Sequence, residues 1–189
     1  MNISELYNIV RKLEERVTKL ESENYKLKNQ KKSIQDFSNI EEPILLFDVW
    51  CIDLLEKIPN YLEHVFNDNL ITGIEKLLND NIENSPIFCH NKQIFIYQKN
   101  NNTINWNKLL NDDLKKFILN IVQHFAKYFH SQWFMVNQHN IQTNDHYQDM
   151  YIDYYQKILG GHHYNSNTFC LKIQKYLYTI AKNNKDSTI

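Results

Sequence analysis

The chain has 189 residues, with 21 Lys and Arg against 22 Asp and Glu and a hydrophobic content of 42%. This composition suffices for one folded core of about 150 residues and excludes a wholly disordered protein. No apolar run approaches the ~18 residues of a membrane-spanning helix. The polar start of the chain is unlike a signal peptide, so we expect no membrane partner.

The first 35 residues follow a heptad repeat. With Ile3 at position a, the a positions hold Ile3, Val10, Val17, Asn24 and Lys31, and the d positions hold Leu6, Leu13, Leu20, Leu27 and Ile34. Apolar residues at this spacing keep one side of a helix facing a partner helix. We expect residues 1–35 to form a coiled-coil dimerisation helix, and we call its a and d residues, Lys31 excepted, the seam.

The seam also predicts the order of the oligomer. β-branched residues at a with Leu at d favour two parallel strands, and the single Asn24 at a fixes the register. In a parallel dimer, Arg16 faces Glu21 and Glu23 faces Lys28 of the partner helix, and both pairs attract. The alternative is an amphipathic helix that lies on the chain's own folded body. The narrow a/d stripe with charged flanks favours the coiled coil.

The stretch from Leu13 to Leu27 resembles the leucine zipper of basic-zipper transcription factors. Those factors carry a strongly basic helix before the zipper. The nine residues before Val10 contain no Lys or Arg, so the resemblance implies dimerisation and does not imply DNA recognition.

Residues 36–43 form a polar linker that ends at Pro43, and residues 44–189 form a domain that we expect to be mainly α. Residues 44–57 are apolar nearly all round, which predicts a buried helix that begins near Pro43 and ends at Pro59. A second helix starts near Asn60 and is interrupted at residues 67–69.

The pattern then changes to an antiparallel β-hairpin or three-stranded element near residues 87–106, where Asn-rich turns separate β-rich runs. Helices return at about residue 107, over residues 143–159 with Gly160 after the last turn, and over residues 167–182. The predicted core contains Trp50, Phe117, Ile121, Phe125, Tyr151, Ile173 and Leu177.

The order of these segments resembles uncharacterised proteins of large DNA viruses with AT-rich genomes. The resemblance is carried by the coil, the run Pro86-Ile87-Phe88-Cys89-His90-Asn91-Lys92, the strand end Tyr97-Gln98-Lys99, Trp106 and the closing Leu171-Lys172-Ile173-Gln174-Lys175-Tyr176-Leu177. That family often has Cys-Thr-Asp and Lys-Arg where this chain has Cys89-His90-Asn91 and Lys92-Gln93. Asn, Lys and Ile are abundant in this chain, and their codons are AT-rich, which indicates an AT-rich genome. The resemblance brings no known activity and implies an intracellular virus-factory or virion setting.

The Cys and His residues do not predict a metal or catalytic site. Cys51, Cys89 and Cys170 are odd in number and far apart, which is typical of reduced thiols in a cytosol-like compartment. Zinc sites use closely spaced ligand pairs, whereas Cys89-His90 are adjacent on a predicted strand and His162-His163 are also adjacent. A Cys–His nucleophile with Cys89 or Cys170 lacks a third, orienting group.

Carboxylates in pairs or rows are the remaining catalytic candidates. Asp112-Asp113 suit the N-terminus of a helix, where negative charge is stabilised. Asp145, Asp149 and Asp153 lie along one helix face and are more typical of a solvated surface than of a metal-dependent nuclease. We therefore expect no enzyme, no cofactor and no metal.

Charge is unevenly distributed. Residues 36–85 carry 11 acidic and 2 basic side chains, and residues 86–189 carry 11 basic and 6 acidic ones. The two blocks either compensate each other or face different partners. The sequence favours a homodimeric, non-enzymatic scaffold that binds an unknown protein partner. The alternative is a dimeric nucleic-acid-binding protein that uses the aromatic-rich C-terminal half, with contacts from Lys172, Lys175 and Lys182.

Overall fold

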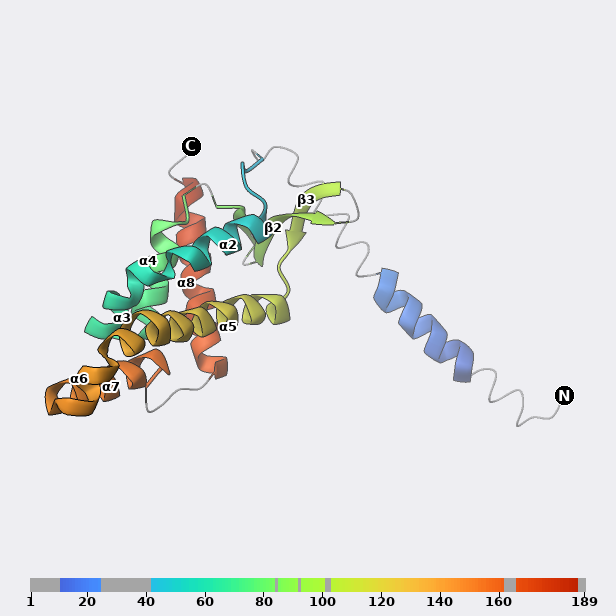
Figure 1. Ribbon diagram of the computed structural model, residues 1–189. Helices are drawn as coiled ribbons and strands as arrows, with labels where there is room; N and C mark the ends of the chain where they lie inside the picture. The colour runs from blue at the N-terminus through green and yellow to red at the C-terminus, as the bar shows by residue number, and fades with distance from the viewer. Residues whose placement is uncertain are drawn as a thin grey trace. The chain divides into compact units, whose positions relative to one another are not determined.

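The computed structural model describes residues 11–24, 42–83, 85–91, 93–100, 103–161 and 166–186. The chain forms two compact units, residues 1–41 and 42–189. Residues 11–24 of the first unit are helical (Figure 1), which confirms the helix predicted there. The seam residues Ile3, Leu6, Val10, Leu27 and Ile34 lie outside the described residues, as does most of the predicted linker.

The second unit is mainly helical and holds a small antiparallel sheet, which confirms the predicted fold class of this unit. Its elements in chain order are α2 (Phe47–Lys57), η1 (Ile58–Tyr61, 3-10), α3 (Leu62–Asn67), α4 (Leu70–Asp80), β1 (Ile87–His90), β2 (Gln93–Asn100), β3 (Thr103–Lys108), α5 (Asn111–Tyr128), η2 (Phe129–Phe134, a π-helix), α6 (Met135–Thr143), α7 (Asp145–Ile158) and α8 (Ser166–Asp186).

The sheet has the order β1-β2-β3 with antiparallel neighbours. Asn91 adopts a φ of 48° in the β1–β2 turn, a conformation that Asn tolerates better than most residues. Alternate residues of β2 face opposite sides, so Ile94 and Ile96 join the main core. On the other side, Trp106 of β3 packs 5.3 Å from the ring of Tyr97. Both sides of the central strand are therefore covered.

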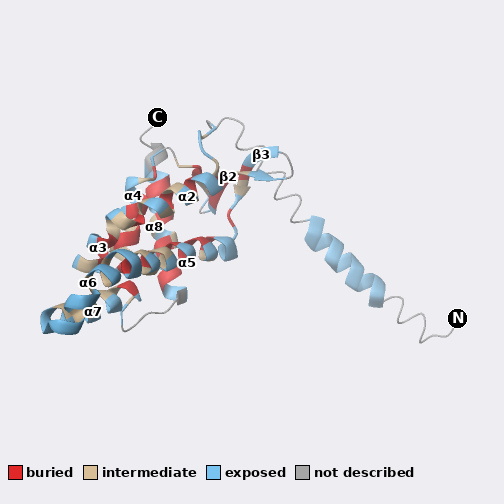
Figure 2. Cartoon of the chain, in the orientation of Figure 1, coloured by how far each residue is buried: buried red, intermediate tan, exposed pale blue. Residues whose placement is uncertain are grey.

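The main core lies where α2, α4, α5 and α8 meet (Figure 2). Each of these helices places an apolar stripe inward, as the 3.6-residue period requires. Six predicted core residues are buried, and Tyr151 is partly buried and packed against them. The six are Trp50, Phe117, Ile121, Phe125, Ile173 and Leu177.

The helix predicted over residues 44–57 is confirmed over Phe47–Lys57, but the prediction that it is buried nearly all round was wrong. The helix begins at Phe47, so Pro43 precedes it. Only one face of α2 is buried, and Val49 and Ile52 on the other face are 49% and 60% exposed. A helix with apolar residues on every side can still be buried on only one of them, and the sequence pattern does not indicate which side that is.

The predicted interruption at residues 67–69 is confirmed. Asn69 is the N-cap of α4, and its side-chain oxygen accepts a hydrogen bond of 3.1 Å from the Thr72 backbone N–H. The expected end of the 143–159 helix is confirmed as well, since Gly160 follows α7 with a φ of 89°. Helix α5 starts at Asn111, four residues later than predicted, because β3 continues to Lys108.

The close contact at Gly73 allows the packing of α3 against α4 to be tested. In the middle of a helix, Ala is favoured over Gly by about 1 kcal/mol. A Cβ at Gly73, however, would clash with Cγ2 of Val65, and overpacking of a core costs about 1–3 kcal/mol. We expect Gly73→Ala to lower the free energy of unfolding by about 1 kcal/mol, measured by urea denaturation.

The same substitution in a Val65→Ala background is the control. The clash is removed there, so Gly73→Ala should raise the free energy of unfolding by several tenths of a kcal/mol or more. Stabilisation in the chain that keeps Val65 would contradict the described packing.

Candidate interaction surfaces

The described part of the seam lies on an exposed helix side. Leu13, Val17 and Leu20 are 51%, 52% and 60% exposed, and Asn24 is exposed as well. The three apolar residues are spaced i, i+4 and i+7, so they share one side of the helix. Such a row leaves apolar side chains half-exposed along one side of a charged helix.

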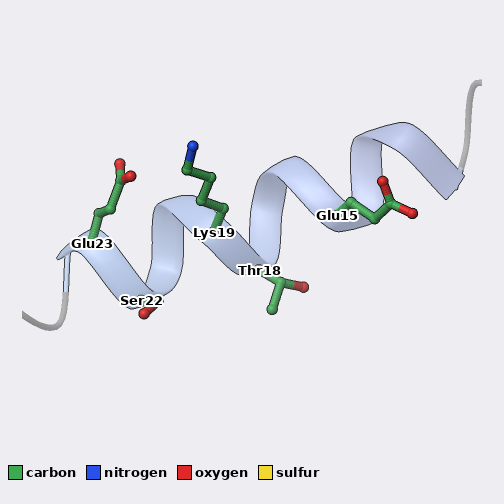
Figure 3. Close-up of a pocket in the computed structure, with 5 residues that line it drawn as sticks. All are labelled: Glu15, Thr18, Lys19, Ser22 and Glu23. Atoms are coloured by element: carbon green, nitrogen blue, oxygen red, sulfur yellow. The ribbon is translucent and has the colours of Figure 1, made fainter.

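The outer side of the same helix is polar. Figure 3 shows Glu15, Lys19 and Glu23 on one side of the ribbon and Thr18 and Ser22 on the other. These five residues border an open hollow on a single helix; the heptad assigns Thr18, Lys19, Glu15 and Ser22 to the outer positions b, c and f, and Glu23 to position g beside the seam. Because their surface is solvent-facing and polar, it suits the outside of a coiled coil and forms no enclosed ligand site.

The predicted nucleic-acid contacts lie together on α8. Lys172, Lys175 and Lys182 are exposed and follow one another at steps of three and seven residues, which places them on one helix side. Residues 166–185 contain no carboxylate. On α4, burial raises the pKa of Glu75, while the nearby charge of Lys172 lowers it. One of the three lysines therefore has an acidic neighbour.

An aromatic cluster around the π-helix η2 was missed by the sequence reasoning. The rings of Phe129 and Trp133 stack at 5.5 Å, and the rings of Phe66 and Tyr154 stack at 4.0 Å with an angle of 8°. π-Helical turns are often found at functional sites. Here the rings contact one another and join α3, α5 and α7, so they act as core packing rather than as a platform for exposed bases.

Helix α7 carries the predicted row of carboxylates on its surface. Asp145, Asp149 and Asp153 are all exposed, and Asp153 pairs with Lys157 at 2.8 Å. Lys157 also donates a 2.7 Å hydrogen bond to the backbone carbonyl of Phe66. This geometry assigns the row to surface charge and helix anchoring. Beside it lies an exposed apolar row, the α7 stripe, which consists of Ile152, Tyr155 and Leu159.

Burial keeps two of the three thiols in the protonated form. Burial, followed by the charge of Asp48, raises the pKa of Cys51 to about 12, and burial raises the pKa of Cys170. Both thiols therefore stay protonated at neutral pH, where the thiolate is the nucleophile. No group of three or more His, Cys, Asp or Glu in the described part of the chain could hold a metal ion. His162 and His163 lie outside that part.

No protein-family model matches the chain, and the comparisons with curated proteins and with solved structures give no significant match. Within the described residues, each helix is too short or too polar to cross a lipid bilayer. The surfaces of the chain itself are therefore the basis for assigning its function.

Proposed function

We propose that this protein is a parallel homodimeric scaffold, which presents two copies of its helical unit to a protein partner. The observation that supports this is the exposed row Leu13, Val17 and Leu20 on a described helix with a heptad sequence. Full burial of a Val or Leu side chain contributes about 1.5–3 kcal/mol. A second copy of the helix would bury this row along a seam that continues in both directions in the sequence.

Charge and polarity support a parallel arrangement of the two helices. Asn24 at an a position meets its own copy in a parallel, in-register pair, where the two amides can hydrogen-bond. Arg16 and Glu23 at g positions face Glu21 and Lys28 at the e positions of the partner. Each of these exposed pairs contributes about 0.3–0.5 kcal/mol, so they select orientation more than they add stability.

A scaffold is the function that best fits the remaining surfaces. Dimerisation raises the apparent affinity for a repetitive or multimeric partner without any new contact, because the second binding event becomes intramolecular. The resemblance to proteins of large DNA viruses suggests that this partner is met inside an infected cell, in a virus factory or a virion.

A dimeric nucleic-acid-binding protein is the second candidate. One observation favours it: Lys172, Lys175 and Lys182 are exposed together on a helix side without carboxylates. Two others weigh against it, namely the acidic neighbour Glu75 and the inward packing of the aromatic cluster. Arg, the residue best suited to bidentate recognition of phosphates and bases, is also missing from residues 86–189.

The dimer is tested by sedimentation of the full chain. We expect a mass of two chains at micromolar concentration, and a monomer when Leu13 and Leu20 are both changed to Glu, because four carboxylates would then face each other in the seam. The matched control adds the same two charges on the outer side of the helix, with Thr18→Glu and Ser22→Glu, and should stay dimeric.

A wild-type monomer at that concentration would exclude the scaffold proposal. Asn24→Ile should produce higher oligomers beside the dimer, since the buried Asn is what specifies two strands.

Nucleic-acid binding is tested by its salt dependence. Counterion release makes such binding fall steeply between about 50 and 200 mM salt. If the second candidate is correct, a random duplex or single strand binds at micromolar concentration, and Lys172→Glu with Lys175→Glu removes most of the salt slope. Lys99→Glu with Lys127→Glu makes the same charge change at other exposed lysines and is the control. The absence of binding at the lower salt concentration would exclude this candidate.

A further inference from the structure

The outer face of α2 and the two residues at positions 44 and 45 before it carry apolar side chains that stay exposed. Ile44, Leu45, Val49 and Ile52 are 91%, 36%, 49% and 60% exposed. Val49 and Ile52 lie about one turn apart on the outer side of α2, and Ile44 and Leu45 directly precede the helix, so the exposed apolar surface continues past its N-terminus. We call these four residues the α2 stripe.

The opposite face of α2 holds the stripe in place. The ring of Phe47 packs 5.5 Å from that of Phe117 on α5. Trp50 Nε1 donates a 3.1 Å hydrogen bond to the backbone carbonyl of Asn81, and Lys57 Nζ donates a 2.8 Å hydrogen bond to the side-chain oxygen of the same residue. Because these contacts hold the inner face of α2, its outer face is a preformed surface, which lowers the entropic cost of binding.

Negative charge borders the stripe. Asp48 and Glu56 are exposed on the same side of α2 as Val49 and Ile52. Residues 42–63 contain five carboxylates and a single cation, Lys57. The ammonium of Lys57 already lies 2.6 Å from the carboxylate of Asp53. The charge that faces outward beside the stripe is therefore acidic.

This combination of apolar row and acidic border selects among the possible occupants. A second copy of the stripe would bring the acidic groups Asp48 and Glu56 of both copies into one interface, because a two-fold interface uses the same patch on each copy, and like charges across an interface are costly. Nucleic acids and anionic lipid surfaces are repelled for the same reason. A helix with apolar residues on one side and Lys or Arg along its edges satisfies both features.

We propose that the α2 stripe is the docking site for a basic amphipathic helix of a protein partner. Val49 and Ile52 receive the apolar side of that helix, and Asp48 and Glu56 pair with its cations. This inference names the partner class of the proposed scaffold and rests on that function. In a dimer the two stripes would bind two such helices, so a partner with two copies of the helix gains avidity.

The test uses the full chain and a synthetic peptide of about 18 residues, long enough for about five helical turns. The peptide has Leu at i, i+3, i+4 and i+7 positions, Lys elsewhere, and a fluorescent label for anisotropy. We expect micromolar binding. Val49→Ser with Ile52→Ser should weaken it at least about 10-fold through the loss of apolar contact. Asp48→Asn with Glu56→Gln should weaken it and flatten its salt dependence.

The α7 stripe offers a matched control, since it is also an exposed apolar row beside carboxylates. Ile152→Ser with Leu159→Ser should leave peptide affinity unchanged. All four substituted residues are at least 49% exposed, and far-UV circular dichroism checks that each variant is folded. The inference is overturned if the peptide does not bind, if the α7 variants lose as much affinity as the α2 variants, or if the α2 variants lower the oligomeric mass instead.

A further variant distinguishes failure of the docking proposal from failure of the dimer proposal. In the Leu13→Glu, Leu20→Glu chain, peptide affinity per chain should match that of the wild type, because the α2 stripe is complete within one copy. Binding lost in that variant alone would place the peptide on the seam and would overturn the docking site on α2.

Discussion

The ring contact between α2 and α5 sets the orientation of α2, on which both its buried and its exposed face depend. Phe47, Trp50 and Phe117 form a triangle of rings whose centroids are 5.5–6.0 Å apart. Aromatic pairs of this kind contribute about 0.5–1.5 kcal/mol beyond the burial of their surface. The triangle orients α2, and with it both the buried face that closes the core and the apolar face that remains outside.

The charged side chains of the acidic block have different neighbours on α2 and on α4. Where α4 meets α8, burial and the charge of Asp68 raise the pKa of Glu75, and the charge of Lys172 partly opposes this rise, so charges of the two blocks lie close together there. On α2 the only cation between residues 42 and 63 is already paired with Asp53. Within residues 42–63, Asp48 and Glu56 beside the α2 stripe therefore have no further cation to pair with.

Much of this organisation could be predicted from local patterns. The helix over residues 11–24, the break at Asn69 and the hairpin turn at Asn91 each follow from residue spacing or from the conformations that Asn tolerates. The covered face of α2 could not be predicted, because apolar residues surround that helix and long-range contacts with Phe117 and Asn81 decide its orientation. The π-helix η2 was missed because its widened turn depends on ring packing with Phe66 and Tyr151, which are distant in sequence. The α2 stripe was also missed, because the sequence pattern does not indicate which face of α2 is covered.

The most direct test of the account is the orientation of the two N-terminal helices in solution. We consider full chains in which the three native cysteines are replaced by Ala and one cysteine is introduced at Leu13 or at Asn24. In a parallel, in-register pair each position lies opposite its own copy. In an antiparallel pair of helices over residues 3–34, position 13 lies opposite position 24. We expect a short bismaleimide to link Leu13→Cys to itself far more than it links a Glu15→Cys control on the outer side. Preferential linking of Leu13→Cys to Asn24→Cys in a mixture of the two chains would contradict it.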